Sequence, residues 1–166
     1  MPQFDPTEIL RVLNEHDVDF VIVGGLAAAL HGSDVATFDL DITPLTTHAN
    51  LERLSAALRE LSAALRVPGE PEGVAFDPDP ALLETMSILN LVTRAGDLDV
   101  IARPAGSSGY VDLRQDAARI TIDGESILIA SLSDVIRSKE AADREKDRIV
   151  LPRLRRLLAR QALQID

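Results

Sequence analysis

The chain has 166 residues, 46% of them hydrophobic, with a formal net charge of −10 at pH 7 and no cysteine. These values suit one globular domain over residues 1–166, and they exclude disulfides, thiolate zinc sites and a protein that coats nucleic acid. No apolar run approaches the roughly 20 residues of a membrane span, and the first residues lack the pattern of a signal peptide, so we expect a cytoplasmic protein with no membrane partner.

The N-terminal quarter of the chain predicts two strands separated by a glycine pair. A helix over 7–16 precedes a run of β-branched and aromatic residues over 18–23, which is typical of a buried strand. Gly24-Gly25 then predicts a tight turn into a short, alanine-rich helix over 26–31. A second strand is predicted over 37–43.

The middle of the chain predicts a long helix, a loop and a hairpin. An amphipathic pattern of leucines indicates a helix from about 46 to about 65. The segment 67–80 is rich in proline, glycine and acidic residues, which favours a loop. Two strands follow over 88–93 and 98–102, joined by a glycine-containing turn.

The last part of the chain predicts a second hairpin and two helices. Strands over 119–122 and 126–129 meet across Asp123-Gly124, a strong hairpin signal. Helices are predicted over 131–143 and 147–163.

Together these elements predict an α/β fold with a small mixed β-sheet and flanking helices. The core of the domain would occupy about 18–130, and the C-terminal helices about 131–163. The elements lack the regular strand–helix alternation of a Rossmann domain, and Gly24-Gly25 does not form the glycine motif of that fold.

Two aspartates, Asp39 and Asp41, are the clearest sign of chemistry in the sequence. Alternate residues of a strand point to the same face, so these carboxylates should lie side by side. Two like charges at this separation are unfavourable unless a cation lies between them, and carboxylate oxygens suit Mg²⁺. We therefore expect a metal site here.

The glycine pair before the short helix has two interpretations. Glycines at a helix start expose backbone N–H groups that a phosphate can approach, because no Cβ blocks it. The alternative is a plain turn between a strand and a helix. The aspartates that follow Gly24-Gly25 after thirteen residues favour the phosphate site.

Gly24-Gly25, the thirteen-residue interval and Asp39-Leu40-Asp41 together resemble the signature of the nucleotidyltransferase fold, the DNA polymerase β-like superfamily. The local runs His31-Gly32-Ser33 and Thr37-Phe38 resemble more narrowly the AbiEii/MenT-type branch, which includes toxin-like proteins. Members of that branch often carry an arginine where this chain has Val35, a position where an arginine would contact phosphate or base.

The resemblance implies a metal-dependent nucleotidyltransferase that moves an NMP from an NTP to a hydroxyl acceptor, with Mg²⁺ or Mn²⁺ as cofactor. The acceptor would be an RNA such as tRNA, a protein side chain or a small molecule. In a toxin–antitoxin system, the partner would be a cognate antitoxin or toxin protein. The alternative is a pseudoenzyme of the same fold that binds nucleotide or a partner protein without turnover.

The resemblance also implies a third carboxylate from a neighbouring strand. Asp99 is the first candidate, because it lies within an apolar strand after a glycine-containing turn. Asp97 is the second candidate and also fits a turn residue. Asp39, Asp41 and Asp99 would then be the catalytic residues and the ligands of two divalent ions, with Asp99 as general base or bridging ligand.

Hydroxyl and basic side chains complete the predicted site. Ser33 and Thr37 would contact phosphate or satisfy backbone groups near a turn. Lys139 lies in a segment that resembles the Lys…Arg-x-Lys-Asp tail of the branch, where the lysine faces the triphosphate; the alternative is a surface charge. Arg144 and Lys146 are further candidates for phosphate contact.

The basic residues gather near the C-terminus. Residues 137–160 hold nine lysines and arginines against four acidic residues, a local charge of +5. Such a segment would receive a triphosphate or an RNA backbone, or it would balance acidic neighbours as a solvated helix face. Asp147 fits a helix cap better than a ligand, and His31 either ends a helix or belongs to the site.

Overall fold

Eight strands and seven helices follow one another in residues 3–164, the part of the chain that the computed structural model describes. Among these residues, no helix is long and apolar enough to cross a membrane. In chain order the elements are α1 (Pro6–Glu15), β1 (Phe20–Val23), α2 (Gly24–Leu30), β2 (Asp39–Pro44), α3 (His48–Glu60), β3 (Ala64–Val67), β4 (Glu70–Val74), α4 (Pro80–Thr85), β5 (Ile88–Thr93), β6 (Gly96–Ile101), α5 (Tyr110–Gln115), β7 (Ala118–Ile122), β8 (Glu125–Ile129), α6 (Leu132–Ala142) and α7 (Glu145–Ala162).

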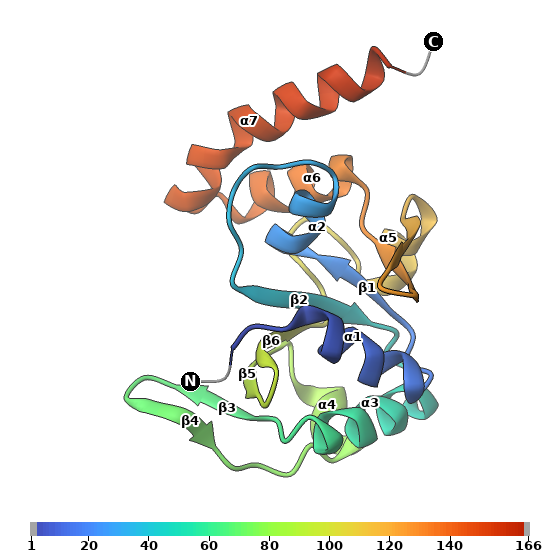
Figure 1. Ribbon diagram of the computed structural model, residues 1–166, viewed down its shortest axis with the longest axis vertical. Helices are drawn as coiled ribbons and strands as arrows, with labels where there is room; N and C mark the ends of the chain where they lie inside the picture. The colour runs from blue at the N-terminus through green and yellow to red at the C-terminus, as the bar shows by residue number, and fades with distance from the viewer. Residues whose placement is uncertain (1–2, 165–166) are drawn as a thin grey trace.

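The strands form one mixed sheet in the order β4-β3-β5-β6-β2-β1-β8-β7. β1 runs antiparallel to β2 and parallel to β8, and β2 runs parallel to β6. The other pairs are antiparallel. Helices α1 and α3 lie on one side of the sheet, and α2, α6 and α7 lie on the other (Figure 1).

The main hydrophobic core lies between the sheet and the helices α1 and α3. Leu40 and Ile42 of β2 point into this core and are fully buried. Since alternate residues of a strand face opposite sides, Asp39 and Asp41 must face the side covered by α2. The following side chains have no exposed surface in this cluster: Ile9, Val12, Leu13, Ile22, Leu40, Ile42, Leu54, Leu58 and Leu98.

The predicted α/β class, with a mixed sheet and flanking helices, is confirmed. The middle of the chain differs from the prediction. The long helix stops at Glu60 rather than near 65, and Ser62 follows it with φ of 53°. The predicted loop over 67–80 is wrong in its first half, because 64–74 forms the β3–β4 hairpin.

The β3–β4 hairpin has a local cause. Pro68 and Gly69 stand at its turn, and Gly69 has φ of +87°. Proline followed by glycine is the preferred pair at the centre of a type II turn, because the second position requires positive φ. Two short helices, α4 and α5, also form where the sequence predicted no regular structure.

Candidate functional site

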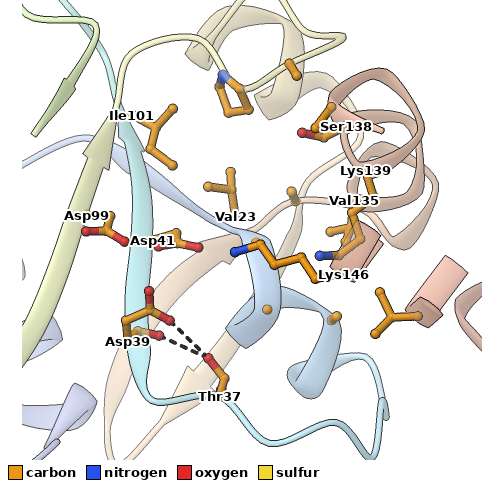
Figure 2. A pocket seen from close by; sticks show the side chains of 18 of the residues that line it. Val23, Thr37, Asp39, Asp41, Asp99, Ile101, Val135, Ser138, Lys139 and Lys146 are labelled. Carbon is orange, nitrogen blue, oxygen red and sulfur yellow. Dashed lines mark hydrogen bonds between the residues drawn. The ribbon is translucent and has the colours of Figure 1, made fainter. Parts of the chain in front are cut away.

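Four aspartates lie on one face of two neighbouring strands. The parallel register of β2 and β6 pairs Asp39 with Asp97 and Asp41 with Asp99. Carboxylate oxygens of Asp39, Asp41 and Asp99 all lie within 4.8 Å of one another, and Figure 2 shows these three side chains together at the pocket wall. The structure therefore brings together the three acids that the sequence predicts as metal ligands.

The surroundings of Asp41 disfavour the charged form of its carboxyl group. Burial raises the pKa of Asp41 to about 8, and the charges of Asp39 and Asp99 add to this effect. Its buried Oδ1 has no hydrogen-bond partner within residues 3–164. Burial also raises the pKa of Asp99, against the opposing charge of Arg66. Clustered carboxylates with an unpartnered buried oxygen fit a divalent cation, for which such oxygens are preferred ligands.

Gly24 makes room for the Asp41 carboxylate at the start of α2. Its φ is +68°, a conformation that side chains disfavour. A Cβ on Gly24 would overlap Asp41 Oδ2 and lie 3.0 Å from Asp41 Cγ. The first glycine of the pair is therefore required by the backbone and by the neighbouring acid, in addition to any contact with phosphate.

We expect Gly24→Ala to destabilise the protein by about 3 kcal/mol, since positive φ and overpacking act together. The matched control is Gly124→Ala. Gly124 has φ of +86° but open space around its Cα, so only the backbone strain applies there, about 1 kcal/mol. Thermal unfolding of both variants measures the difference. Equal destabilisation of the two variants would contradict a steric contact between position 24 and Asp41.

Thr37, in the loop before β2, supports Asp39, and Gly25 of α2 leaves room for the Thr37 side chain. Thr37 Oγ1 donates to the Asp39 carbonyl oxygen at 3.2 Å and approaches Asp39 Oδ1 at 3.5 Å, as the dashed lines in Figure 2 show. A Cβ on Gly25 would lie 3.3 Å from Thr37 Oγ1. Ser33 instead accepts a hydrogen bond from the Val35 amide at 3.3 Å, which organises its own loop.

Lys139 and Lys146 enter the pocket from the helices on the opposite side. Both residues line the pocket, and their side chains extend into it in Figure 2. Lys139 Nζ lies 3.5 Å from Asp147 Oδ1, whereas Lys146 forms no ion pair within residues 3–164. Two ammonium groups opposite an acidic cluster are well placed for an anionic ligand such as a triphosphate.

Asp147 and His31 have structural roles. Asp147 is fully buried and accepts hydrogen bonds from Arg144 N at 3.2 Å and Arg144 Nε at 2.7 Å. Burial opposes ionisation of Asp147, but the bonds from Arg144 outweigh it and lower the pKa. Asp147 therefore caps α7 from its third position, whereas the N-cap residue is Arg144 and the helix begins at Glu145, two residues before the predicted start. His31 Nε2 lies 2.8 Å from the Ala130 carbonyl oxygen, which fixes the end of α2.

Arg66 of β3 belongs to the site, although sequence reasoning did not find it. Arg66 Nη1 lies 3.1 Å from Asp97 Oδ2, and Arg66 Nη2 forms a second ion pair with Asp99 Oδ1. The guanidinium of Arg66 is therefore paired with both carboxylates, Asp97 and Asp99. The alternation of Leu65, Arg66 and Val67 before Pro68 is the signal that indicates a strand here.

The site residues surround a pocket of about 750 Å³ between the sheet and the helices α2, α6 and α7. Phe38 lines the pocket and is 77% exposed. This volume is ordinary for a small-molecule or nucleotide site. The apolar lining residues of the pocket include Val35, Phe38, Ile88, Ile101, Pro104 and Ala105.

The mixed sheet and the helices on its two sides match the nucleotidyltransferase fold of solved structures. LnuA, a lincosamide antibiotic adenylyltransferase with bound lincomycin, has a TM-score of 0.60 and 18% identity over 92% of this chain and 95% of its own. The candidate nucleotidyltransferase TM1012 from Thermotoga maritima has a TM-score of 0.55 and 18% identity over 92% and 94%.

An antigenic nucleotidyltransferase-like protein from Paracoccidioides brasiliensis also shares the fold, with a TM-score of 0.50 and 21% identity over 96% of this chain and 77% of its own. No protein-family model and no curated protein matches the chain. The predicted nucleotidyltransferase fold is therefore confirmed, and the narrower AbiEii/MenT-type branch stays a prediction.

Proposed function

We propose that the protein is a nucleotidyltransferase that moves an NMP from an NTP to a hydroxyl acceptor and requires Mg²⁺ or Mn²⁺. The observation that carries this proposal is the cluster of Asp39, Asp41 and Asp99, in which one buried oxygen of Asp41 has no hydrogen-bond partner among the described residues. The likeness to LnuA, which is an adenylyltransferase, supports nucleotidyl transfer as the reaction class.

The three acids would hold the divalent cation. When bound, the cation would polarise the α-phosphate and favour ionisation of the attacking hydroxyl. Thr37 would keep Asp39 in position through its bond to the Asp39 carbonyl oxygen. Gly24 would keep Asp41 close to the start of α2, because no Cβ intervenes there.

The triphosphate would lie between the acids and the helical wall. Lys139 and Lys146 would bind its oxygens with compact positive charges. The backbone amides of Gly24-Gly25 would approach the phosphates. Ser33 remains a predicted phosphate contact. Arg144 is less available for the triphosphate, because its Nε donates a hydrogen bond to Asp147.

In the proposed reaction the acceptor oxygen bonds to the α-phosphorus while the bond from that phosphorus to the bridging oxygen of the β-phosphate breaks. Pyrophosphate leaves, and the hydroxyl proton passes to a base. Asp99 is the proposed base, because burial raises its pKa toward the working pH. Arg66 must first move away from Asp99, since it forms an ion pair with that carboxylate.

The identity of the acceptor and the biological role are the finer parts of the proposal. An RNA such as tRNA, a protein side chain and a small molecule each offer a hydroxyl. A toxin–antitoxin role, with a cognate protein partner, rests on the sequence resemblance alone. A pseudoenzyme that only binds nucleotide is the second candidate, and the ion pair between Arg66 and Asp99 favours it, because it blocks the third acid.

The test is transfer of label from each α-³²P-NTP, with Mg²⁺ or Mn²⁺, into total bacterial RNA, total protein, a panel of small hydroxyl compounds and the protein itself. The double variant Asp39→Asn/Asp41→Asn is the control. Label that is absent with the double variant would support the enzyme and identify the acceptor class. NTP binding without label in any pool would contradict turnover and favour the pseudoenzyme.

A further inference from the structure

Helix α7 carries a basic stripe that begins at the pocket. Lys146, Arg153, Arg156 and Arg160 recur at intervals of three, four or seven residues. At 3.6 residues per turn they share an arc of about 80° on one side of the helix. All four side chains are exposed. We call these four residues the α7 stripe.

The α7 stripe differs from the other basic residues of the same helix. Arg148 and Arg155 lie on another side of α7 and pair with Asp143 at 2.8 Å and Glu140 at 3.1 Å. Within residues 3–164, the four residues of the α7 stripe form no ion pair. Residues 148–162 also contain no acidic residue at all. The balancing of acidic neighbours therefore explains Arg148 and Arg155 but not the stripe.

The α7 stripe is continuous with the candidate active site. Lys146 belongs to the stripe and also lines the pocket, together with Val150 and Leu154 on the adjacent side of α7. Helix α7 lies on the outside of the molecule over α6, so the stripe is open to a large ligand (Figure 1). With a rise of 1.5 Å per residue, the stripe leads about 21 Å away from the pocket.

We propose that the three arginines of the α7 stripe bind the phosphodiester backbone of a nucleic-acid acceptor and guide its terminal hydroxyl toward Lys146 and the pocket. This inference rests on the proposed function, because it names the acceptor class of that reaction. Regularly spaced arginines suit a chain of phosphates. Only one apolar side chain, Ile149, lies within the arc, and protein interfaces usually need apolar anchors at their centre.

The acidic residues outside the α7 stripe should lower the affinity of the protein for nucleic acid. The whole chain has a net charge of −10, so repulsion from the rest of the surface opposes binding of any polyanion. Binding should therefore be weak, confined to the α7 stripe and strongly dependent on salt. For a single strand, each phosphate that the protein neutralises adds about 0.7 to the steepness of log K against log salt.

The experiment is fluorescence anisotropy of the full chain with labelled single-stranded RNA and with DNA of the same sequence, over a range of salt. Arg153→Gln/Arg156→Gln is expected to weaken binding about tenfold and to reduce the salt slope by about 1.4. The matched control, Arg148→Gln/Arg155→Gln, removes the same charge from the same helix and should bind as the wild type does. Comparison of the two strands shows whether RNA or DNA is the ligand.

Three results would overturn the inference: no binding of either strand, equal weakening in both variants, or displacement of the strand by polyglutamate as readily as by unlabelled RNA. The last result would indicate an acidic protein partner. Asp39→Asn/Asp41→Asn separates this inference from the proposed function, because it should bind the strand while label transfer is abolished. If the wild type bound the strand at the α7 stripe but transferred no label, the proposed nucleotidyl transfer would be contradicted. The α7 stripe would still be supported as a nucleic-acid-binding surface.

Discussion

Asp41→Asn is expected to reduce nucleotidyl transfer by about 10³-fold or more, because removal of a metal ligand takes away several kcal/mol of transition-state stabilisation. The same variant should be more stable than the wild type in metal-free buffer above pH 8, by about 2 kcal/mol or more. Asp41 is largely buried beside Asp39 and Asp99. Asparagine keeps the shape of the side chain and removes the unfavourable charge.

The gain in stability should depend on pH. The pKa of Asp41 is raised to about 8 in the folded protein, against about 3.9 in an unfolded chain. Between these values the folded state holds a proton that the unfolded state has released, so wild-type stability falls as pH rises toward 8. The advantage of Asp41→Asn should therefore be small near pH 5 and largest above pH 8.

Thermal unfolding of wild type and Asp41→Asn across this pH range, with a chelator present, measures the effect. Asp34→Asn is the control, since Asp34 is exposed in the loop before β2 and its substitution removes the same charge. It should alter neither transfer nor stability appreciably. Retained transfer in Asp41→Asn, or a variant less stable than wild type above pH 8, would contradict the assignment of the acidic cluster.

Arg66→Gln is expected to raise the affinity of the acidic cluster for Mn²⁺ about fivefold, since a partly exposed ion pair that competes with the metal is worth about 1 kcal/mol. Arg66 contacts both Asp97 and Asp99, and a cation cannot bind Asp99 fully while the guanidinium holds it. The metal-free variant should also be less stable, because the clustered carboxylates no longer have their protein cation. Added Mn²⁺ should restore that stability.

Isothermal titration with Mn²⁺ and thermal unfolding measure both effects. Arg59→Gln is the matched control, because Arg59 pairs with the exposed Asp77 at 2.6 Å on the protein surface. This substitution should leave Mn²⁺ affinity unchanged. Weaker Mn²⁺ binding in Arg66→Gln would mean that Arg66 supports the metal site rather than competing for it.

The parts of the site that could be predicted depend on local pattern. Asp39 and Asp41 share a strand, so period two alone places them on one face. The glycine pair predicts room for a phosphate, and the structure adds that the space beside Gly24 is filled by Asp41. Asp99 is expected from the family resemblance, and the parallel register of β2 and β6 brings it opposite Asp41.

The parts of the site that could not be predicted depend on contacts between strands that lie far apart in the sequence. Arg66 and Asp99 are 33 residues apart, and they meet only because β5 lies between β3 and β6 in the sheet. Strand order of this kind is not encoded in any single segment. The turn at Pro68-Gly69 is a usable signal, but the surrounding prolines and acids favour a loop. The short helices α4 and α5 have too few residues for a periodic pattern, so tertiary packing decides them.

The most direct test of the central claim is a Mn²⁺ titration followed by electron paramagnetic resonance, which measures free Mn²⁺ in the presence of the protein. The claim is that Asp39, Asp41 and Asp99 form a divalent-cation site. We expect the wild type to bind Mn²⁺ in competition with Mg²⁺, and Asp39→Asn/Asp41→Asn to lose this binding while it stays folded. Equal Mn²⁺ binding by the wild type and the double variant, or none by the wild type, would contradict the account.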